Sequence, residues 1–463
     1  MSIDALKAAV GAAVVWDRAE LASRDPGFDS RNFEALALVR PANVEGVVAL
    51  LRYCTENGIS LVAQGGRTGL AGGAATTGDQ IICDLGAMNR IEHIDPLARV
   101  AVVQAGASLA AVQEAARAYG LDPGIDLAAR GSCTIGGMIS TNAGGIMAFR
   151  NGTMRHRILG LEVVLPDGRV FDDLTRVLKV SAGYDLKQVF VGAEGTLGIV
   201  TRAAIRLEPV PGASAIALIA VDDAASAQRV VGHFLGRASL RAAEIMWQKF
   251  SQTMAMMLGI DPTSLPLDAP CLLILELESD TPENAARELE EGLAEIWSEA
   301  HIRDGIIANS LQQAQTIWRL REETEQLERR HSHPPSFDVS VPGGALDDYV
   351  SRIRTGLSTL DARLDAYVFG HLADGNLHIV INTDGPLAPD RHSAIEEVLY
   401  AGLRDMGGSF SAEHGVGIDK RDAYERHADP VKLELARSVK ALLDPKNLLN
   451  PGKIVNRRPR ETD

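Results

Sequence analysis

Hydrophobic and polar residues follow two different patterns in the first part of the chain. Between residues 41 and 207, short apolar runs alternate with stretches whose apolar residues recur every three or four positions. The runs are typical of buried strands, and the recurrence is typical of amphipathic helices. The expected strands are 59–64, 80–85 and 100–106, and the expected helices are 44–53 and 106–120. Ser108 can cap the second helix and Gly120 ends it, so the pattern predicts an α/β region.

The pattern changes near residue 213, where glycine becomes scarcer and longer helical stretches begin. The expected strands here are 215–221 and 271–278, and the expected helices are 284–300, 311–330 and 431–443. Residues 364–382 predict two strands joined by a tight Asp-Gly turn. The helix breakers in 444–455 predict an ordered loop near the chain end.

The length of the chain adds a constraint on domain number. A chain of 463 residues is too long for one hydrophobic core, so two or three domains are expected. We expect four parts: an N-terminal helical segment, a glycine-rich domain, a second domain and a C-terminal segment, at 1–31, 32–212, 213–430 and 431–463.

Charge and cysteine content narrow the choice of partners. The 46 Lys and Arg against 61 Asp and Glu give a net charge of -15, which disfavours nucleic acid and anionic lipid surfaces. The N-terminus lacks a basic leader, and no apolar run approaches the roughly 20 residues that cross a bilayer. We therefore expect a cytoplasmic protein. The four cysteines form no CxxC pair, which disfavours a disulfide framework and an iron–sulfur centre.

Two glycine-rich segments, 64–73 and 131–145, suggest where an anion binds. Each places several glycines where backbone N–H groups can converge on a phosphate without a Cβ in the way. Neither is a GxGxxG dinucleotide fingerprint or a GxxxxGK[ST] loop. The sequence therefore does not indicate a nicotinamide or nucleoside triphosphate site.

Six motifs in order carry a resemblance to a known family. They are GGxTGLxGG (65–73), IGGxxSTNAGG (135–145), GxEGTLGIVT (192–201), HxxDGNxH (371–378), EHGxG (413–417) and NPGKI (450–454). The chain resembles the FAD-binding oxidoreductases of the vanillyl-alcohol oxidase and p-cresol methylhydroxylase (PCMH) type, in the D-lactate and D-2-hydroxyglutarate dehydrogenase branch. The resemblance covers roughly residues 32–457 and implies an α+β fold. A PCMH-type FAD-binding domain of two α/β subdomains would be followed by a substrate domain with an antiparallel sheet and flanking helices. The resemblance also implies that the C-terminal segment 431–463 returns to the FAD-binding domain.

The resemblance also implies which residues bind FAD. They come from the two glycine loops, from GxEGTLGIVT and from NPGKI: Gly65, Gly66, Arg67, Thr68, Gly69, Leu70, Gly72, Gly73, Ser132, Thr134, Ile135, Gly136, Gly137, Ser140, Asn142, Gly144, Gly145, Glu194, Gly195, Ile199 and Asn450. The chain departs from the family at two positions. It has Arg67 where the family often has Asn, and Asn151 where Tyr is common. Since the loops hold no matching His, we expect tight noncovalent FAD.

A metal site is expected around residues 371–378. His371 and His378 are separated by a turn that lets their imidazoles converge, and Glu413 would complete a two-His, one-carboxylate set with open positions for substrate. The resemblance implies that these three bind zinc or another divalent metal such as Mn²⁺. His414 is the candidate base that takes the proton of the substrate hydroxyl. If His414 is structural instead, a metal-bound hydroxide remains as the base.

The expected substrate contacts are Arg321, which matches a family arginine for a carboxylate, and Asn376. Ser336 and Glu325 stand where hydroxyglutarate-selective members, as we align them, carry Lys and Thr that help hold a second carboxylate. We therefore favour D-lactate-like or larger apolar D-2-hydroxy acids over D-2-hydroxyglutarate. D-Malate stays open, with Arg319, His331 or His333 as alternative anchors.

Three other functions compete with a stand-alone FAD-dependent D-2-hydroxy acid dehydrogenase. The chain could be the catalytic flavin subunit of a glycolate oxidase-like complex. A non-enzymatic scaffold would have no need for the metal residues and His414 together, and a metal-dependent hydrolase would not explain the twin glycine loops. The electron acceptor, whether electron-transfer flavoprotein, quinone or cytochrome, is not readable from the chain, and a homodimer is a common state for such a protein.

Overall fold

The computed structural model describes residues 2–236, 239–332, 334–384 and 387–456. Its contacts divide the chain into two compact units. The first unit contains residues 1–145, 151–210 and 413–463, and the second contains residues 146–150 and 211–412. Among the described residues, no helix is both long and apolar enough to cross a bilayer.

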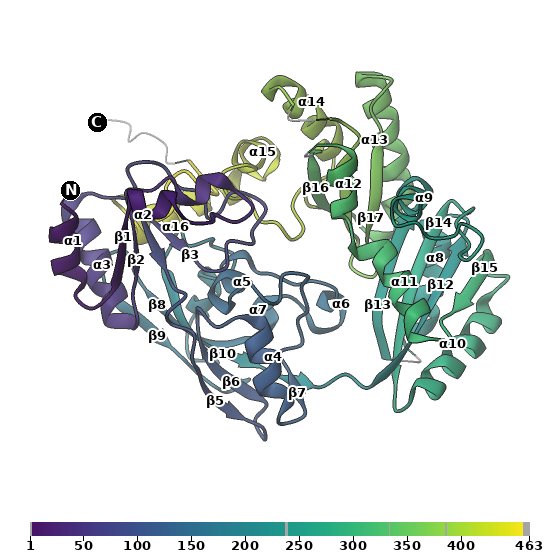
Figure 1. Cartoon of the computed structure of the whole chain (residues 1–463), viewed down its shortest axis with the longest axis horizontal. Coiled ribbons are helices and arrows are strands. Elements are labelled where there is room, and N and C mark those ends of the chain that lie inside the picture. Colours follow the sequence, from purple (N-terminus) through teal and green to yellow (C-terminus); the bar gives the residue numbers. More distant parts are fainter. Residues whose placement is uncertain (1, 237–238, 333, 385–386, 457–463) are drawn as a thin grey trace. The chain divides into compact units, whose positions relative to one another are not determined.

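Two sheets form the centre of the first unit (Figure 1). The four-stranded sheet has the order β1-β2-β4-β3 and consists of Val14–Asp17, Ala37–Arg40, Ile81–Asp84 and Leu61–Gln64. The five-stranded antiparallel sheet has the order β5-β6-β10-β8-β9 and consists of Ile91–Asp95, Val100–Gln104, Ile199–Arg206, Ile158–Val164 and Val170–Asp173. A two-stranded ribbon pairs β11 (Glu208–Pro209) with β7 (Leu121–Asp122).

Several helices of the first unit begin at a residue whose side chain caps them. Asn43 accepts the N–H of Gly46 at the start of α3, and Ser108 accepts the N–H of Ala111 at the start of α4. The helices are α1 (Ile3–Val10), α2 (Arg18–Ala22), α3 (Val44–Asn57), α4 (Leu109–Arg117), α5 (Ile135–Thr141), α7 (Met154–Arg157), α15 (Arg421–His427) and α16 (Pro430–Leu443). Helix α6 (Ala148–Asn151) spans a boundary of the units, and short 3-10 helices occupy Ser30–Phe33 and Leu186–Val189.

A seven-stranded antiparallel sheet forms the second unit (Figure 1). Its order is β15-β12-β14-β13-β17-β18-β16, which corresponds to Ile302–Ile307, Ala213–Val221, Cys271–Ser279, Ser239–Trp247, Ala366–His371, Asn376–Ile381 and Ser336–Ser340. The flanking helices are α8 (Ala224–Phe234), α9 (Gln248–Met257), α10 (Pro282–Ile296), α11 (Leu311–Glu322), α12 (Glu325–Arg330), α13 (Leu346–Leu360) and α14 (Pro389–Tyr400), with a 3-10 helix at Gly343–Ala345.

One face of this sheet packs against α9, α11 and α12 in a single apolar cluster. Phe250 of α9 stacks on Phe369 of β17, with ring centroids 4.1 Å apart. Ile317 and Leu320 of α11 belong to the same cluster and are fully buried. The packing holds α11 against the strands that carry the predicted metal ligands.

Most predicted elements are observed, with two differences. The helix expected over 311–330 breaks into α11 and α12 around Glu323 and Thr324, where neither glycine nor proline marks the break. The second domain was expected to end at residue 430, whereas the contact-based unit ends at Ala412. The segment from Glu413 onward belongs to the first unit because its backbone is bonded there. Ile418 N–H, for example, donates to the carbonyl of Ala71.

Candidate active site

A pocket in the first unit lies between the two glycine-rich loops. Its volume is about 340 Å³. A Cβ at Gly66 would lie 2.0 Å from the carbonyl oxygen of Ser132, and one at Gly65 would lie 2.1 Å from the hydroxyl oxygen of Thr134. Only glycine allows the two loops to pack this closely.

Most residues that the resemblance assigns to FAD line this pocket: Gly65, Gly66, Arg67, Thr68, Gly69, Leu70, Gly73, Thr134, Gly136, Gly137, Ser140, Gly144, Glu194, Gly195, Ile199 and Asn450. Five do not line it: Gly72, Ser132, Ile135, Asn142 and Gly145. Ile135 is buried in the core, and the Asn142 side chain accepts hydrogen bonds from Thr153 and from the N–H of Arg155. The assignment of these five residues to FAD stays a prediction.

Unsatisfied polar atoms in the pocket wall fit a polar ligand. Within the described part of the chain, Gln64 Oε1, Arg67 Nε and Asn450 Oδ1 are buried without a hydrogen-bond partner. All three residues line the pocket. Because buried polar atoms without partners are costly, such a cluster indicates a binding site for a ligand with its own donors and acceptors. The glycine backbone and these three atoms fit FAD.

Glu194 holds the EHGxG segment against this pocket. Its buried carboxylate accepts the backbone N–H groups of Val416 and Gly417, both at 2.7 Å. Burial raises the pKa of Glu194, and the two N–H groups oppose the rise. Gly417 has φ +53°, and a Cβ there would lie 1.7 Å from the carbonyl oxygen of Ala71. Glu413 and His414, at the start of this segment, both line the pocket.

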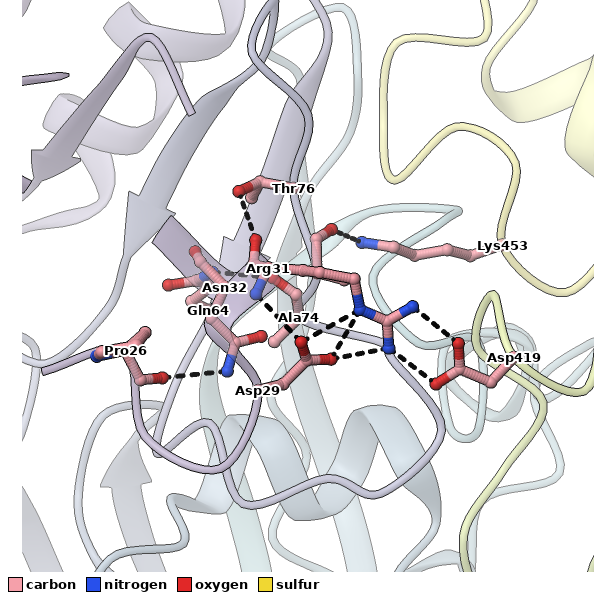
Figure 2. Close-up of polar contacts among 10 residues, drawn as sticks. Pro26, Asp29, Arg31, Asn32, Gln64, Ala74, Thr76, Asp419 and Lys453 are labelled. Atoms are coloured by element: carbon pink, nitrogen blue, oxygen red, sulfur yellow. Dashed lines mark hydrogen bonds and ion pairs between the residues drawn. The ribbon is translucent and has the colours of Figure 1, made fainter. Parts of the chain in front are cut away.

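A cluster of charged residues contacts Asp419, two residues after the EHGxG segment (Figure 2). Arg31 lies between Asp29 and Asp419, with N–O distances of 2.7 and 2.8 Å, and these hydrogen bonds raise the pKa of Arg31. Lys453 of NPGKI donates to the carbonyl of Ala75 at 2.7 Å. Burial lowers the pKa of Lys453 to about 7, although the negative charge of Glu194 acts in the opposite direction.

The two predicted histidine ligands lie together in the second unit. His371 ends β17 and His378 lies within β18, and the turn between these strands brings their ring centroids to 5.4 Å. Gly375 makes this turn possible because it has φ +74°, and a Cβ there would lie 2.1 Å from the carbonyl of Val341. The hairpin thus brings the two imidazoles together.

Glu413 follows directly on Ala412, whose backbone is held in the second unit. The N–H of Ala412 donates to Asp338, and Asp338 lies opposite His378 in the β16–β18 pairing. One ligand atom each from His371, His378 and Glu413 lies within 4.8 Å of the others. Two imidazoles and a carboxylate are a donor set for zinc and related divalent ions.

Glu244 of β13 connects a candidate metal ligand with a candidate substrate residue. Its Oε1 lies 2.6 Å from Nδ1 of His371, and its Oε2 lies 2.8 Å from Nε of Arg321. Burial alone would raise the pKa of Glu244, but the charges of His371 and Arg321 outweigh it and hold the pKa below its usual value. Arg321 also lies over the ring of Phe369, 4.8 Å from its centroid.

The other predicted substrate residues lie in different environments. Asn376 is buried, and among the described residues neither polar atom of its side chain has a hydrogen-bond partner. Ser336 is exposed at the start of the edge strand β16. Glu325 is exposed on α12, 3.9 Å from Arg329 of the same helix. Asn376 is therefore the residue whose surroundings most clearly lack a partner.

Of the alternative anchors for a second carboxylate, His331 contacts Asp384 and the hydroxyl of Tyr367, each at 3.0 Å. Arg319 is paired with Glu323. His333 lies outside the described residues. No feature of the described anchors marks one of them as a binding site.

Sequence reasoning missed Glu244 and Asp338 and assigned no role to Lys453. The available signal for Glu244 was a single carboxylate inside the apolar run 242–247. Asp338 is likewise a lone carboxylate in a buried strand. An acidic residue in a buried strand requires a partner, but only the folded chain identifies it.

Comparisons with known proteins match both units. A family model described as "FAD binding domain" matches residues 35–189, and one described as "FAD linked oxidases, C-terminal domain" matches residues 210–454. The mitochondrial D-2-hydroxyglutarate dehydrogenase of Bos taurus is 35% identical over 422 residues, which is 90% of this chain and 76% of that protein. The D-2-hydroxyglutarate dehydrogenase of Stutzerimonas stutzeri is 34% identical over 427 residues, 90% of each chain.

Solved structures give the fold. The 4-ethylphenol oxidase of Gulosibacter chungangensis matches with a TM-score of 0.72 at 20% identity, over 99% of this chain and 97% of that one. p-Cresol methylhydroxylase matches with a TM-score of 0.69 at 16% identity, over 91% and 89%. The predicted PCMH-type α+β fold is thereby confirmed. The chain belongs to the FAD-linked oxidases, in the branch that contains the D-2-hydroxyglutarate dehydrogenases, and is an FAD-linked D-2-hydroxy acid dehydrogenase.

Proposed function

We propose that this enzyme oxidises its D-2-hydroxy acid with the help of a divalent metal, zinc in the first instance, held by His371, His378 and Glu413. The observation that carries the proposal is the position of Glu413 and His414. Glu413 supplies a ligand atom within 4.8 Å of those of the two histidines, and His414, the next residue, lies in the wall of the FAD pocket. A candidate metal ligand and a candidate base are therefore neighbours in the chain, on a segment whose start lines the FAD pocket.

Each residue of the proposed site has a separate role in the reaction. Bound FAD supplies the hydride acceptor, and a bound divalent metal supplies positive charge that makes the substrate hydroxyl more acidic. His414 takes the proton from that hydroxyl, and Arg321 binds the substrate carboxylate. Asn376 offers a buried amide to a polar group of the substrate. Glu194 keeps the segment that carries His414 in place through its two backbone contacts.

The substrate that we propose is a D-lactate-like or larger apolar D-2-hydroxy acid. Ser336 carries no charge for a second carboxylate, and Glu325 is negative, so neither favours a dicarboxylate. The names of the relatives favour D-2-hydroxyglutarate as the competing substrate. We further propose that electrons pass from the flavin to a separate acceptor, such as electron-transfer flavoprotein, a quinone or a cytochrome.

Anaerobic flavin bleaching tests the reaction and its substrate. The purified protein is mixed in turn with D-lactate, D-malate, D-2-hydroxyglutarate, a bulky apolar D-2-hydroxy acid and the corresponding L-acids. We expect bleaching by D-acids alone, fastest with the monocarboxylates. Fastest bleaching by D-2-hydroxyglutarate would contradict our substrate preference. Reduction of an artificial dye by the single chain separates a stand-alone enzyme from a subunit that needs a complex.

Two variants test the metal site. His378→Ala is expected to lose the bound metal and to reduce the bleaching rate by about a hundredfold or more, while FAD stays bound in the first unit. His392→Ala is the control, because His392 lies on α14 with a 43% exposed side chain and outside the ligand set. Full activity of His378→Ala without stoichiometric metal would rule out the proposed role of the metal.

A further inference from the structure

Glu244 occupies an unusual position for a carboxylate. It lies on β13, an interior strand of the seven-stranded sheet, and its neighbours across the strands are His371 on β17 and Ile274 on β14. Its side chain is 2% exposed. Charged residues are rarely buried so completely unless they are paired, so the contacts of Glu244 explain its presence.

The two carboxylate oxygens of Glu244 contact two different candidate functional residues. Oε1 lies 2.6 Å from Nδ1 of His371. Oε2 lies 2.8 Å from Nε of Arg321, in an ion pair whose N–H is poorly aligned with the oxygen. One side chain therefore joins the strand that carries a metal ligand to the helix that carries the proposed carboxylate-binding arginine.

We propose that Glu244 is a positioning residue that sets both the metal ligand His371 and the substrate-binding Arg321. The inference rests on the proposed metal function and deepens it. Glu244 would act through these two neighbours, so that the metal position and the carboxylate position are coupled through one carboxylate.

The contact with His371 determines which ring nitrogen is available to a metal. A neutral imidazole carries one proton, and an acceptor at Nδ1 favours the tautomer with the proton on Nδ1. This tautomer leaves the lone pair on Nε2, the nitrogen that would bind a metal, and the contact holds the ring in one orientation. Acceptors of this kind behind ligand histidines raise metal affinity by roughly 10- to 100-fold.

The contact with Arg321 determines which edge of the guanidinium faces a substrate. Glu244 occupies the Nε position, so the edge formed by the two Nη groups is left for a substrate carboxylate. That edge binds a carboxylate through two parallel hydrogen bonds. Phe369 packs against the same guanidinium, 4.8 Å from its carbon, and limits its rotation.

The negative charge of Glu244 is the counter-charge of the buried Arg321. Arg321 is buried, and its positive charge lies near a site where we propose a divalent cation. The negative charge of Glu244 offsets the guanidinium, which would otherwise be buried without a counter-ion and would repel the metal. A neutral side chain of the same shape therefore tests both the charge and the orientation.

Glu276 supplies a matched control from the same sheet. It is a buried glutamate on β14, 3.1 Å from Arg241 and 2.6 Å from the hydroxyl of Ser214. Removal of its charge breaks a partly buried ion pair of the second unit in which neither His371 nor Arg321 takes part. A loss that comes only from reduced stability of the sheet should appear in both variants.

The experiment compares wild type, Glu244→Gln and Glu276→Gln as FAD-loaded full-length proteins. Zn²⁺ is the metal probe, and its dissociation constant is measured by competition with a chromophoric chelator. KM and kcat are measured with the best D-2-hydroxy acid from the bleaching series. We expect Glu244→Gln to weaken Zn²⁺ binding by about 10- to 100-fold and to raise KM by about 10-fold, with unchanged FAD content. For Glu276→Gln, both values should stay within about twofold of wild type.

The same substitution in an Arg321→Met background separates the effect on KM from the effect on Zn²⁺ binding. In Arg321→Met, the added substitution Glu244→Gln should raise KM no further, because the arginine through which it acts is gone. Zn²⁺ binding should still weaken. An equal further rise in KM in this background would contradict the action of Glu244 through Arg321.

The possible outcomes distinguish the inference from the proposed function. If wild type binds Zn²⁺ and Glu244→Gln binds it equally well with an unchanged KM, the inference is wrong and the metal function stands. If Glu276→Gln loses Zn²⁺ affinity to the same extent, Glu244 is only structural. If wild type bleaches fully with substrate while it binds no divalent metal, the metal function fails, and the part of the inference that concerns His371 fails with it.

Discussion

Glu194→Gln is expected to loosen the segment that carries His414 and to slow flavin reduction. In the native protein, both oxygens of the buried Glu194 carboxylate accept backbone N–H groups, from Val416 and Gly417, at 2.7 Å each. A glutamine keeps one acceptor oxygen but turns an NH2 group toward the second N–H. One charge-assisted hydrogen bond is lost, and the backbone N–H and the NH2 group that faces it are both left without an acceptor.

The magnitude follows from these contacts. A hydrogen bond to a charged group contributes about 1.5–3 kcal/mol to stability, so the free energy of unfolding of the first unit should fall by about that amount. Burial raises the pKa of Glu194, which offsets part of the native stabilisation and favours the lower end of the range. The segment should shift by little on average but sample more conformations. Flavin reduction should therefore fall by more than substrate affinity.

The assay combines urea unfolding, followed by flavin fluorescence, with stopped-flow bleaching by the best D-2-hydroxy acid. Glu162→Gln is the control, since Glu162 is a buried glutamate of β8 paired with Arg202 and the hydroxyl of Thr201, and it does not line the pocket. It should lose stability without a specific loss of the reduction rate. Wild-type stability and rate in Glu194→Gln, or an equal loss of rate in both variants, would refute the reasoning.

Three further predictions follow from burial and close packing. Gly66→Ala should abolish tight FAD binding, because its Cβ would lie 2.0 Å from the carbonyl oxygen of Ser132. Gly131→Ala is the control and should retain FAD, because a Cβ there has no atom within 4 Å. The FAD content of each variant is measured after gel filtration. Burial lowers the pKa of Lys453 from 10.5 to about 7. Between these two pH values Lys453 is protonated in the unfolded chain and neutral in the folded protein. The free energy of unfolding of wild type should therefore rise with pH in this range. The Tm of wild type relative to Lys453→Met should therefore increase from about pH 7 to about pH 9.5, and a constant difference would contradict this. Burial also raises the pKa of Cys54 to about 12, and the other three cysteines are buried as well, so a thiol reagent should label few of the four before denaturation and all of them after it.

The hydrophobic pattern predicted the strands and helices because each buries one face or both. The apolar runs at 80–85, 215–221 and 271–278 correspond to β4, β12 and β14. The break between α11 and α12 was not predictable, since local propensity there is compatible with a continuous helix. Leu320 on α11 and Leu327 on α12 are buried in the same apolar cluster, a tertiary arrangement that propensity alone does not specify.

The sequence predicted that the two histidines lie close together, but it did not predict the residues that hold them. His371 and His378 were expected to converge through their turn, and the structure places their rings 5.4 Å apart. Their roles, and that of His414, stay predictions until metal and activity are measured. Glu244 could not be predicted, because its two partners lie 77 and 127 positions away along the chain.

By itself, the sequence determined the α+β class, the two glycine loops and the order of the family motifs, because these depend on residue type and short-range spacing. Only the tertiary structure decided which unit the segment after Ala412 joins and which carboxylates contact the candidate site residues. Those outcomes depend on contacts between distant strands and loops, such as Glu194 with Val416 and Glu244 with Arg321. A buried charge must find a partner, and the fold determines which one it meets.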